Sequence, residues 1–472
     1  MKEKKFLKQP GDNNPVMTQH FGADPYAIVY DGRVYLYMTA DEYEYDKDGN
    51  IGENTYGKIN TLRVISSDDL VNWTDHGAIN AAGPDGEAKW GGNSWAPAAC
   101  FKMIGGKPKF FLYFANSGNG IAVLTADSPI GPFRDPIGRP LISRATPNCA
   151  DVEWLFDPAV LVDGDEAYLY VGGGIPGPEK IADPGTARVV KLGEDMISLA
   201  EDPMPIENVS YLFEDSGINK INDKYIYTYC SNFDVPPQGA PAGFGRGEII
   251  AMVSDKPRGP FKMYGSILKN PEYFFKTGGN NHHCMFEFKG EWYIAYHARI
   301  LEDAMDIHGG YRSTNIDRVT FDDKGNILPI TATRSGVREV KRVNPYSVVD
   351  GVTMSNQSGT GSRPYGEVSE AAGYGNMILS DITDGSWVCV SNVDFGTISP
   401  ENLYIKMRGE GSGYVHMRIN DLHGKDIAVI KFDKSAEFTT FEATMQDNVM
   451  GVNEVYFVYE NGGFEIKEWW FE

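Results

Sequence analysis

Hydrophobic and polar positions alternate in a pattern that recurs five times along the first 335 residues. Each copy begins with a small or charged residue, continues as an apolar stretch, turns, and ends in an aromatic-rich stretch. A period of two predicts β-strands, and the Asp-Gly, Gly-Gly, Asn-Asp or Lys-Gly pairs between the stretches predict hairpin turns. The predicted hairpins are DPYAIVYDGRVYLYMT from Asp24, APAACFKMIGGKPKFFLYFA from Ala96, DPAVLVDGDEAYLYVG from Asp157, EDSGINKINDKYIYTYCS from Glu214 and HHCMFEFKGEWYIAYHAR from His282.

A second pair of strands is predicted after each hairpin. These second stretches begin at Leu62, Ile121, Ala187, Glu248 and Ile316. Four strands repeated five times, with hairpins about 57 to 72 residues apart, predict a five-bladed β-propeller. A large sandwich is the alternative architecture, but it would not explain why the two half-patterns alternate strictly.

The propeller prediction places chemically important residues together. The innermost strand of each blade lines the central channel of a propeller. If each hairpin begins on its inner strand, the first residues of the hairpins occupy equivalent positions around that channel. We therefore expect Asp24, Asp157, Glu214 and His282 to converge at one end of the axis.

The pattern changes after residue 338. Residues 344–472 contain short alternating stretches without the repeat, and residues 393–432 alternate as a pair of sandwich strands would. The predicted fold class is therefore all-β: a five-bladed propeller over residues 1–338, followed by a β-sandwich of the jelly-roll type over residues 344–472.

Charge and cysteine content narrow the function classes. The formal net charge is -22, which argues against nucleic acids and anionic membrane surfaces as partners and is compatible with a neutral ligand such as a sugar. The five cysteines are scattered without a Cys-x-x-Cys pair, so we expect buried free thiols. The first 15 residues lack the apolar core of a signal peptide. We therefore expect the cytoplasm, with secretion as the alternative if the sequence was trimmed.

Several carboxylates in one pocket are suited to catalysis by a general acid and a general base. Like charges in one pocket push their pKa values apart, so that one carboxyl keeps its proton while another stays a base. Glycoside hydrolysis needs such a pair, and a third carboxylate can hold the pKa of the acid high. Aromatic rings provide flat surfaces for sugars, and the candidates beside the acids are Tyr26, Trp90, Trp95, Phe156 and Phe213. The alternative is that these acids only cap backbone amides at tight turns.

At these residues the sequence resembles glycoside hydrolase family 43. The matching pieces are ADPYAIVYDGRVYLYMT at 23–39, SWAPA at 94–98, FDPAVLVDGDEAYLY at 156–170, FEDSGINKINDKYIYTY at 213–229, GNNHHCMFEFKGEWYIAYH at 279–297 and GYRSTNIDRV at 310–319. The resemblance implies that Asp24 is the general base, Asp157 the residue that raises the pKa of the acid and orients it, and Glu214 the general acid. It also implies inversion at the anomeric carbon, with base and acid about 6.5–9.5 Å apart.

The resemblance implies further site residues. His282, rather than His283, matches a histidine at the centre of the channel that binds calcium or its water in many family members. Arg312 matches an arginine that reaches the innermost sugar, and Asn281, Trp95 and Phe156 are further candidates for substrate contacts. No organic cofactor is expected.

One local departure separates this chain from the usual family pattern. Where family members often have a small residue after the acid, this chain has Asp215, and Gly217 stands where an aromatic residue is common. If Asp215 points at Glu214, it raises the pKa of the acid further. If Asp215 points to solvent, it does little.

Within the family, the chain looks most like arabinoxylan arabinofuranohydrolases. The expected substrates are therefore arabinoxylan or xylo-oligosaccharides carrying arabinofuranosyl branches. A β-xylosidase or a bifunctional xylosidase/arabinofuranosidase would share the catalytic triad, and a non-catalytic sugar-binding propeller is the alternative from another class.

Residues 344–472 resemble carbohydrate-binding module family 6. The resemblance implies a calcium site, but Val352 replaces one of its usual acids, so Asp350 and Glu468 would form a weakened site. Phe438 and Phe441 stand where tryptophans are common. Sugar binding by this domain and a role as a buttress for the propeller both stay open.

Overall fold

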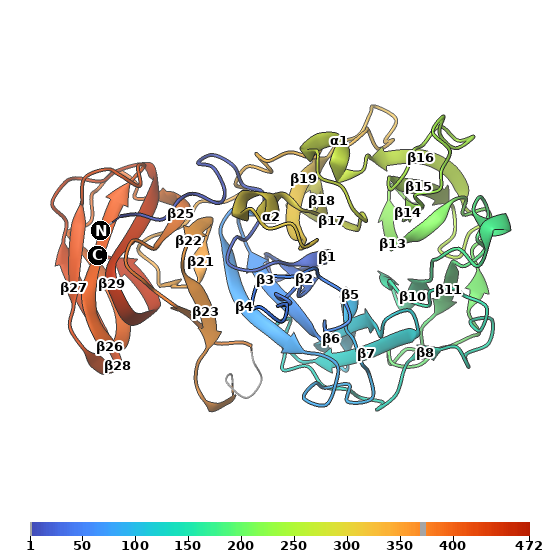
Figure 1. The fold of residues 1–472 in the computed structure, drawn as a ribbon, viewed down its shortest axis with the longest axis horizontal. Helices are drawn as coiled ribbons and strands as arrows, with labels where there is room; N and C mark the ends of the chain where they lie inside the picture. The colour runs from blue at the N-terminus through green and yellow to red at the C-terminus, as the bar shows by residue number, and fades with distance from the viewer. Residues whose placement is uncertain (1, 369–373) are drawn as a thin grey trace.

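The structure, a computed structural model, describes residues 2–368 and 374–472. Figure 1 shows two parts side by side, a ring of blades around a channel and a curled sheet that carries both chain ends. The predicted all-β fold class, with five blades followed by a C-terminal β-domain, is confirmed. Among the residues described, no helix is long and apolar enough to cross a membrane.

Each of the first four blades contains four antiparallel strands that follow one another along the chain. These strands are β1 (Ala23–Tyr30), β2 (Arg33–Thr39), β3 (Thr61–Ser67) and β4 (Trp73–Asn80); β5 (Trp95–Ile104), β6 (Lys107–Ala115), β7 (Gly120–Ala126) and β8 (Ile142–Ser143); β9 (Ala159–Asp163), β10 (Glu166–Val171), β11 (Arg188–Lys191) and β12 (Met204–Pro205); and β13 (Leu212–Ile221), β14 (Lys224–Ser231), β15 (Ile249–Ser254) and β16 (Lys262–Leu268). A 3₁₀ turn, Pro178–Lys180, and a helix, α1 (Pro271–Phe275), lie in the connections.

The fifth blade has three strands, β17 (His283–Phe288), β18 (Glu291–Ala298) and β19 (Ser313–Val319), with α2 (Ile300–Met305) between the last two. Its predicted fourth strand is reduced to isolated bridges, Phe321 with Ile327 and Ile330 with Leu268 of blade 4. The N-terminal segment closes the ring instead, since the Val16 amide donates to the Thr314 carbonyl over 2.9 Å.

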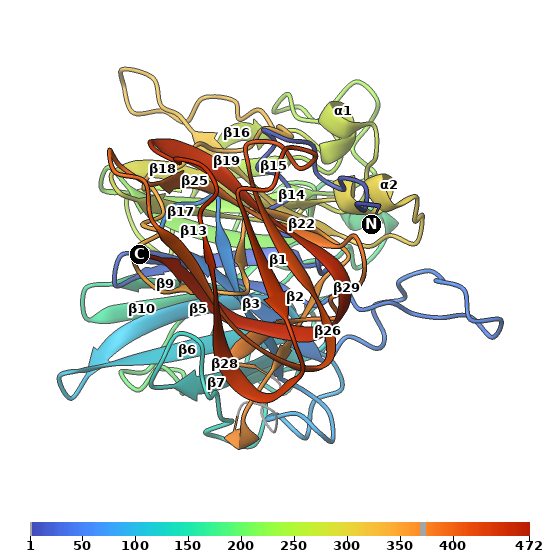
Figure 2. The same cartoon turned by 90° about the vertical axis from the view of Figure 1, so that its left-hand side faces the viewer.

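The C-terminal domain is one curled sheet of nine strands around its own apolar core. Its strands are β20 (Val349–Asp350), β22 (Asn356–Ser358), β23 (Gly361–Pro364), β24 (Met377–Ser380), β25 (Trp387–Asp394), β26 (Asn402–Ile419), β27 (Ala428–Phe432), β28 (Ser435–Thr444) and β29 (Val452–Phe471). The long strands β26 and β29 lie in front of the propeller in Figure 2. Shifts in their register, one of them between Gly409 and Ser412, bend them around the core.

Segments from both sides of the predicted domain boundary tie the two parts together. Strand β21 (Thr353–Met354) pairs with β4 and becomes the fifth strand of blade 1. In the other direction, the N-terminal segment reaches the curled sheet, where Phe6 packs against Trp387 with ring centroids 4.8 Å apart. The Trp387 indole donates to the Lys4 carbonyl over 2.8 Å. The C-terminal domain therefore supports the propeller physically.

All five cysteines are buried and free, as predicted.

Tyr374 of the C-terminal domain is only 5% exposed and belongs to the propeller core. Its hydroxyl accepts the Phe133 amide of blade 2 at 2.8 Å, and its backbone forms a bridge with Gly77 of blade 1. Tyr374 is therefore anchored between blades 1 and 2.

Candidate active site

The acidic residues of blades 1 and 3 sit in bulges at the start of the inner strands. In blade 1 the register with β2 shifts between Ala23 and Tyr26, and in blade 2 the register with β6 shifts between Trp95 and Ala98. In blade 3 Tyr170 pairs with Ala159 and the Gly172 amide donates to the Phe156 carbonyl, so the same offset surrounds Asp157. The bulge residues Asp24, Ala96 and Asp157 all have positive φ angles, 49°, 43° and 49°. A proline follows each of them, and proline needs no ladder partner for its nitrogen. Each bulge therefore turns the side chain of its residue toward the channel.

In blade 4 the equivalent bulge residue is Asp215 rather than Glu214. The register shifts between Glu214 and Gly217, and Asp215 has the positive φ, 69°. Glu214 thus corresponds to Trp95 and Phe156, one position before the bulge. The expected equivalence of Glu214 with Asp24 and Asp157 is corrected by one residue, because Asp215 has the positive φ and Glu214 is the last paired residue before it.

The three candidate catalytic acids do converge on one pocket. The pocket is also lined by His282 and Arg312, both expected, and by residues from the loops of neighbouring blades. Its full lining is Asp24, Tyr56, Trp95, Ala96, Phe156, Asp157, Glu214, Asn280, His282 and Arg312. The structure therefore brings together seven residues from the inner ends of the blades, Arg312 from immediately before β19, and two residues, Tyr56 and Asn280, that neither the repeat nor the resemblance predicted.

Asp24 is held as a carboxylate by its neighbours. Oδ1 accepts from Arg312 Nη1 at 2.9 Å, and Oδ2 accepts from the Thr39 hydroxyl at 2.6 Å. Burial by itself would raise the pKa of Asp24, but the Arg312 guanidinium and the neighbouring His282 outweigh it and hold that pKa well below its usual value. Asp24 is thus ionised at any pH near neutrality.

Arg312 is itself oriented by Asp41, which lies at the end of the first hairpin. Nε and Nη2 donate to the two Asp41 oxygens at 2.9 and 2.8 Å, a bidentate pair. The guanidinium carbon lies 4.8 Å from the centroid of the Tyr56 ring. This clamp leaves Nη1 for Asp24 and presents one edge of the arginine to the pocket.

Glu214, unlike Asp24, has a raised pKa. It is 7% exposed, and its Oε1 has no hydrogen-bond partner. Burial and then the charge of Asp24 raise the pKa of Glu214 to about 8, with partial compensation by Asn280. Burial and the charges of Glu214 and Asp24 also raise the pKa of Asp157. Asp157 and Glu214 therefore retain a proton between them near neutrality, while Asp24 does not.

The Asp215 side chain points neither at Glu214 nor to solvent, the two orientations considered from the sequence. It is fully buried, and its carboxylate contacts two histidines: Oδ2 lies 2.6 Å from His283 Nδ1, and Oδ1 lies 3.2 Å from His282 Nε2. Its charge is also one cause of the raised pKa of Glu214, after burial and Asp24.

One expected substrate contact, Asn281, needs correction, and one further residue of the site, His297, was not expected. Asn281 is fully buried, and its amide donates to the Gly247 carbonyl over 3.1 Å, while Asn280 lines the pocket. Successive residues of an extended segment point to opposite sides, so a shift of one residue reverses the assignment. His297, which the sequence pattern did not single out, accepts the Asp24 amide at Nδ1 over 3.1 Å and lies 3.0 Å from the Asn280 carbonyl at Nε2.

The candidate aromatic residues divide into two groups. Trp95 and Phe156 line the pocket. Phe213 packs against Trp154, with centroids 5.2 Å apart, and Trp154 packs against Phe156 at 5.4 Å. Tyr26 and Trp90 have structural contacts instead: their polar atoms bond the Val160 carbonyl and the Asp135 carboxylate at 2.9 and 2.8 Å.

Asp350 and Glu468 of the C-terminal domain are the carboxylates expected to bind calcium. Asp350 and Glu468 are cross-strand neighbours, as the resemblance implied, but Lys406 Nζ lies 3.2 Å from Glu468 Oε1. No group of three or more His, Cys, Asp or Glu side chains within residues 2–368 and 374–472 is arranged to hold a metal. Calcium takes six to eight oxygens, and this carboxylate pair does not fit it.

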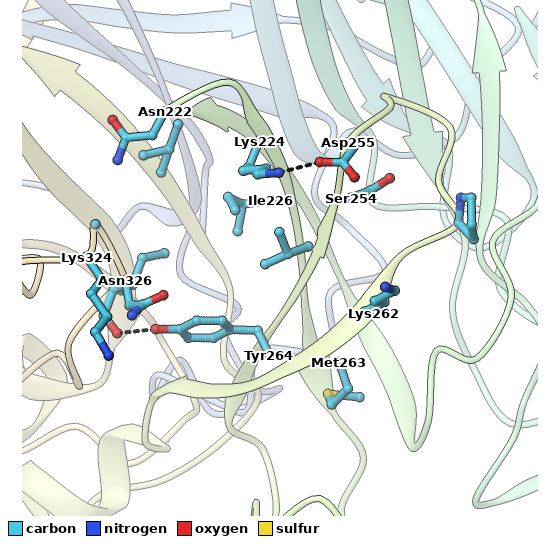
Figure 3. A pocket seen from close by; sticks show the side chains of 15 residues that line it. Asn222, Lys224, Ile226, Ser254, Asp255, Lys262, Met263, Tyr264, Lys324 and Asn326 are labelled. Carbon is cyan, nitrogen blue, oxygen red and sulfur yellow. Dashed lines mark hydrogen bonds and ion pairs between the residues drawn. The ribbon is translucent and has the colours of Figure 1, made fainter.

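A second hollow lies at the opposite end of blade 4, beside the β13–β14 turn (Figure 3). Lys224 forms an ion pair there with Asp255, and the Tyr264 hydroxyl donates to the Ile327 carbonyl over 2.7 Å. Asp255 is the one carboxylate in its lining, so the lining lacks the paired acids that the first pocket has. We therefore assign the chemistry to the pocket at the channel.

The chain is similar to known families and proteins over most of its length. The model of the family described as glycosyl hydrolases family 43 matches residues 13–327, and the model of carbohydrate binding module family 6 matches residues 350–472. The chain is 45% identical to an arabinoxylan arabinofuranohydrolase from Paenibacillus polymyxa, over 97% of this chain and 73% of that protein.

Two solved structures are also similar. A family 43 arabinoxylan arabinofuranohydrolase from Bacillus subtilis, in complex with cellotetraose, superposes with a TM-score of 0.92 at 41% identity and covers 99% of both chains. A β-xylosidase/α-arabinofuranosidase from a compost microbial metagenome, in complex with xylotriose and in a calcium-free form, reaches a TM-score of 0.52 at 26% identity, over 67% of this chain and 96% of that one.

Proposed function

The chain belongs to glycosyl hydrolase family 43, and from this premise we propose that it removes arabinofuranosyl groups from arabinoxylan or its oligosaccharides with inversion. The observation that carries the proposal is the unequal protonation of carboxyls in one pocket: Asp24 has a lowered pKa, while the pKa of Glu214 is raised to about 8. Inverting hydrolysis needs one ionised base and one protonated acid.

In this mechanism Asp24 is the general base. Arg312 and Thr39 each occupy one of its oxygens, so the carboxylate is oriented as well as ionised. It takes a proton from a water molecule that attacks the anomeric carbon. Because the hydrogen bonds are formed before the reaction, little reorganisation is needed in the transition state.

Glu214 is the general acid and Asp157 its partner. The unpartnered Oε1 of Glu214 is a buried polar atom without a protein ligand, which suits a group that donates its proton to a substrate oxygen. Asp157 is held by the Asp215 amide at 2.9 Å, and it shares one proton with Glu214 near neutrality.

The shape of the pocket favours removal of a single sugar. The His282 ring lies within 3.7 Å of carboxylates from three different blades, so it closes the channel beneath the acids. Aromatic rings lead outward from Phe156 through Trp154 and Phe213 to Phe233, which is 39% exposed. We assign this row to the polysaccharide backbone that carries the branch.

Calcium at His282 stays a prediction. A relative with a calcium-free form is known, but His282 offers one ring nitrogen, Nδ1, because Nε2 faces Asp215. Asp24 and Asp157 near that nitrogen already have partners, so the residues present do not build a calcium shell. The side chains of Asp24 and Glu214 therefore supply the base and the acid without a metal ion. Metal analysis of the purified protein checks this point.

The experiment is NMR analysis of the products from arabinoxylan oligosaccharides. We expect arabinose to leave first, with its anomeric configuration inverted. Asp24→Ala and Glu214→Ala should each lower kcat by about 10³-fold or more while the protein stays folded. Asp127→Ala, which removes an exposed carboxylate, is the control and should keep its activity. Release of xylose instead of arabinose, or activity retained by both active-site variants, would overturn the proposal.

A further inference from the structure

Asp215 is the fourth carboxylate at the channel, and its side chain takes no part in the proposed acid and base steps. It occupies the bulge position of blade 4 that Asp24 and Asp157 occupy in blades 1 and 3. Its side chain is fully buried. A buried carboxylate is costly unless every oxygen is satisfied, so the partners of Asp215 indicate what it does.

Those partners are two histidines. Oδ2 lies 2.6 Å from His283 Nδ1, and Oδ1 lies 3.2 Å from His282 Nε2 and accepts the His283 amide at 3.1 Å. A carboxylate only accepts hydrogen bonds, so the 2.6 Å contact places a proton on His283 Nδ1, and the carboxylate oxygen beside His282 Nε2 favours a proton there. Asp215 therefore selects the tautomer of each ring, with Thr228 contacting His283 Nε2 at 2.9 Å.

The selected orientation of His282 affects the catalytic acids. With Nε2 directed at Asp215, Nδ1 of the same ring faces Asp24 Oδ1 at 3.6 Å and Asp157 Oδ2 at 3.7 Å. The Asp215 amide donates to the same Asp157 oxygen over 2.9 Å. One residue thus fixes Asp157 through its backbone and the ring between Asp24 and Asp157 through its side chain.

The packing around Asp215 leaves no room for the aromatic residue common in the family. A Cβ added at Gly217 would lie 2.2 Å from Thr228 Oγ1 and 3.1 Å from the His283 ring. His283 and Thr228 occupy that space in this chain. The Glu-Asp-Ser-Gly run is therefore one packed unit, in which Gly217 admits the histidine that Asp215 orients.

We propose that Asp215 is a positioning residue of the hydrolytic site, which holds His282, His283 and Asp157 so that Asp24 and Glu214 keep their spacing. This inference rests on the proposed function. Substrate contacts are made by other residues, so loss of Asp215 should act on the chemical step rather than on binding. A displacement of about 1 Å in a catalytic group can cost about 100-fold in rate.

The kinetic test compares Asp215→Ala with Asp215→Asn. Alanine removes both acceptors, and kcat should fall about 100-fold with KM changed less than about threefold. Asparagine keeps one acceptor oxygen, which can remain at the Oδ1 position for His282, so kcat should stay within about tenfold of the wild type. Asp317→Ala removes another buried carboxylate, one that binds Tyr296 and Thr333 away from the pocket. It should lower stability and leave kcat unchanged.

A comparison of two substrates shows which catalytic group the Asp215→Ala substitution displaces. Asp215→Ala should slow an aryl arabinofuranoside with a good leaving group as much as an oligosaccharide, because the base is displaced. A loss confined to the oligosaccharide would indicate that only the acid is affected and would overturn the inference. An unchanged kcat, or a change in KM alone, would also overturn it.

Histidine ¹⁵N NMR tests the positioning without any substrate. In the wild type, His282 should be protonated at Nε2 and His283 at Nδ1. The amide of Asp215→Asn has one acceptor and one donor group, so His283 should switch to the Nε2–H tautomer while His282 keeps its own. In Asp215→Ala neither ring has a carboxylate partner, so neither the His282 nor the His283 tautomer is fixed. If neither ring changes, the inference fails, whereas the proposed function fails separately if the wild type releases no arabinose.

Discussion

At the scale of single residues, the site differentiates chemically similar groups by their surroundings. Asp24 and Glu214 are both carboxylic acids with ordinary pKa values near 4. An arginine and a neighbouring histidine keep the first ionised, while burial and the charge of the first keep the second protonated. Their roles therefore come from Arg312, His282 and the depth of the pocket rather than from the residue types.

The pH dependence of activity follows from this difference. Because the pKa of Glu214 is raised to about 8, kcat/KM should fall as pH rises through about 8, where the acid loses its proton. The lowered pKa of Asp24 places the acidic limb below the usual range of an aspartate. The measurement is kcat/KM for an aryl arabinofuranoside from pH 4 to 10. A basic limb below pH 6 would contradict the assignment of Glu214.

Glu214 also makes stability depend on pH. Its folded-state pKa of about 8 lies above the unfolded value of 4.5, so the unfolded chain releases the proton first and stability falls as pH rises between these values. Glu214→Gln has no such group, so its advantage in Tm over the wild type should grow from pH 5 to pH 8. Thermal unfolding at several pH values measures this, and Asp127→Ala, an exposed change, should show no such trend.

At the scale of elements, bulges position the site. They give Asp24, Asp157 and Asp215 positive φ angles and direct them at one axis, while Glu214 stands one residue earlier. Repeat spacing predicted the strands because alternation follows from the pleat. It could not predict the bulges, since they lie at the starts of the inner strands, before the alternating stretches that reveal the strands.

A glycine at the end of β10 provides a test of this local geometry. Gly172 has a φ of 106°, and its amide donates to the Phe156 carbonyl over 2.9 Å beside the pocket. A Cβ there would lie 2.2 Å from the Thr186 carbonyl oxygen. Gly172→Ala should therefore destabilise the fold by about 3 kcal/mol, from backbone strain and overpacking together.

The matched control is Gly185→Ala. Gly185 also has a positive φ, 68°, but no atom lies within 4 Å of its added Cβ. Strain alone should cost about 1–2 kcal/mol. Denaturant unfolding of both variants checks the difference, and equal losses would show that contact with Thr186 does not matter.

At the scale of the whole molecule, several contacts attach the C-terminal domain to the propeller and to the N-terminal segment. Strand β21 extends blade 1, the N-terminal segment packs on Trp387, and Tyr374 enters the propeller core. The domain matches the model of carbohydrate binding module family 6. Sugar binding by this domain and the cytoplasmic location both stay predictions.

The attachment can be tested at Tyr374. Tyr374→Ala removes a ring that is 5% exposed and should lower the free energy of unfolding by about 3–5 kcal/mol. Tyr374→Phe keeps the ring and loses only the bond from the Phe133 amide, at about 1 kcal/mol. Unfolding measurements compare the two variants. The folded Tyr374→Ala protein should keep its kcat, and a wild-type Tm would contradict the anchoring role.

The sequence by itself determined the strands, the fivefold repeat and most of the residues in the pocket. Alternation of apolar side chains is a local property, and matching copies of a repeat occupy matching places in a ring, so Asp24, Asp157 and His282 could be placed together. The charge states of the acids, the exchange of Asn281 for Asn280 and the contacts of Asp215 were decided only by the tertiary structure. They depend on bulges and on side chains from different blades, and neither leaves a signature in the spacing along the chain.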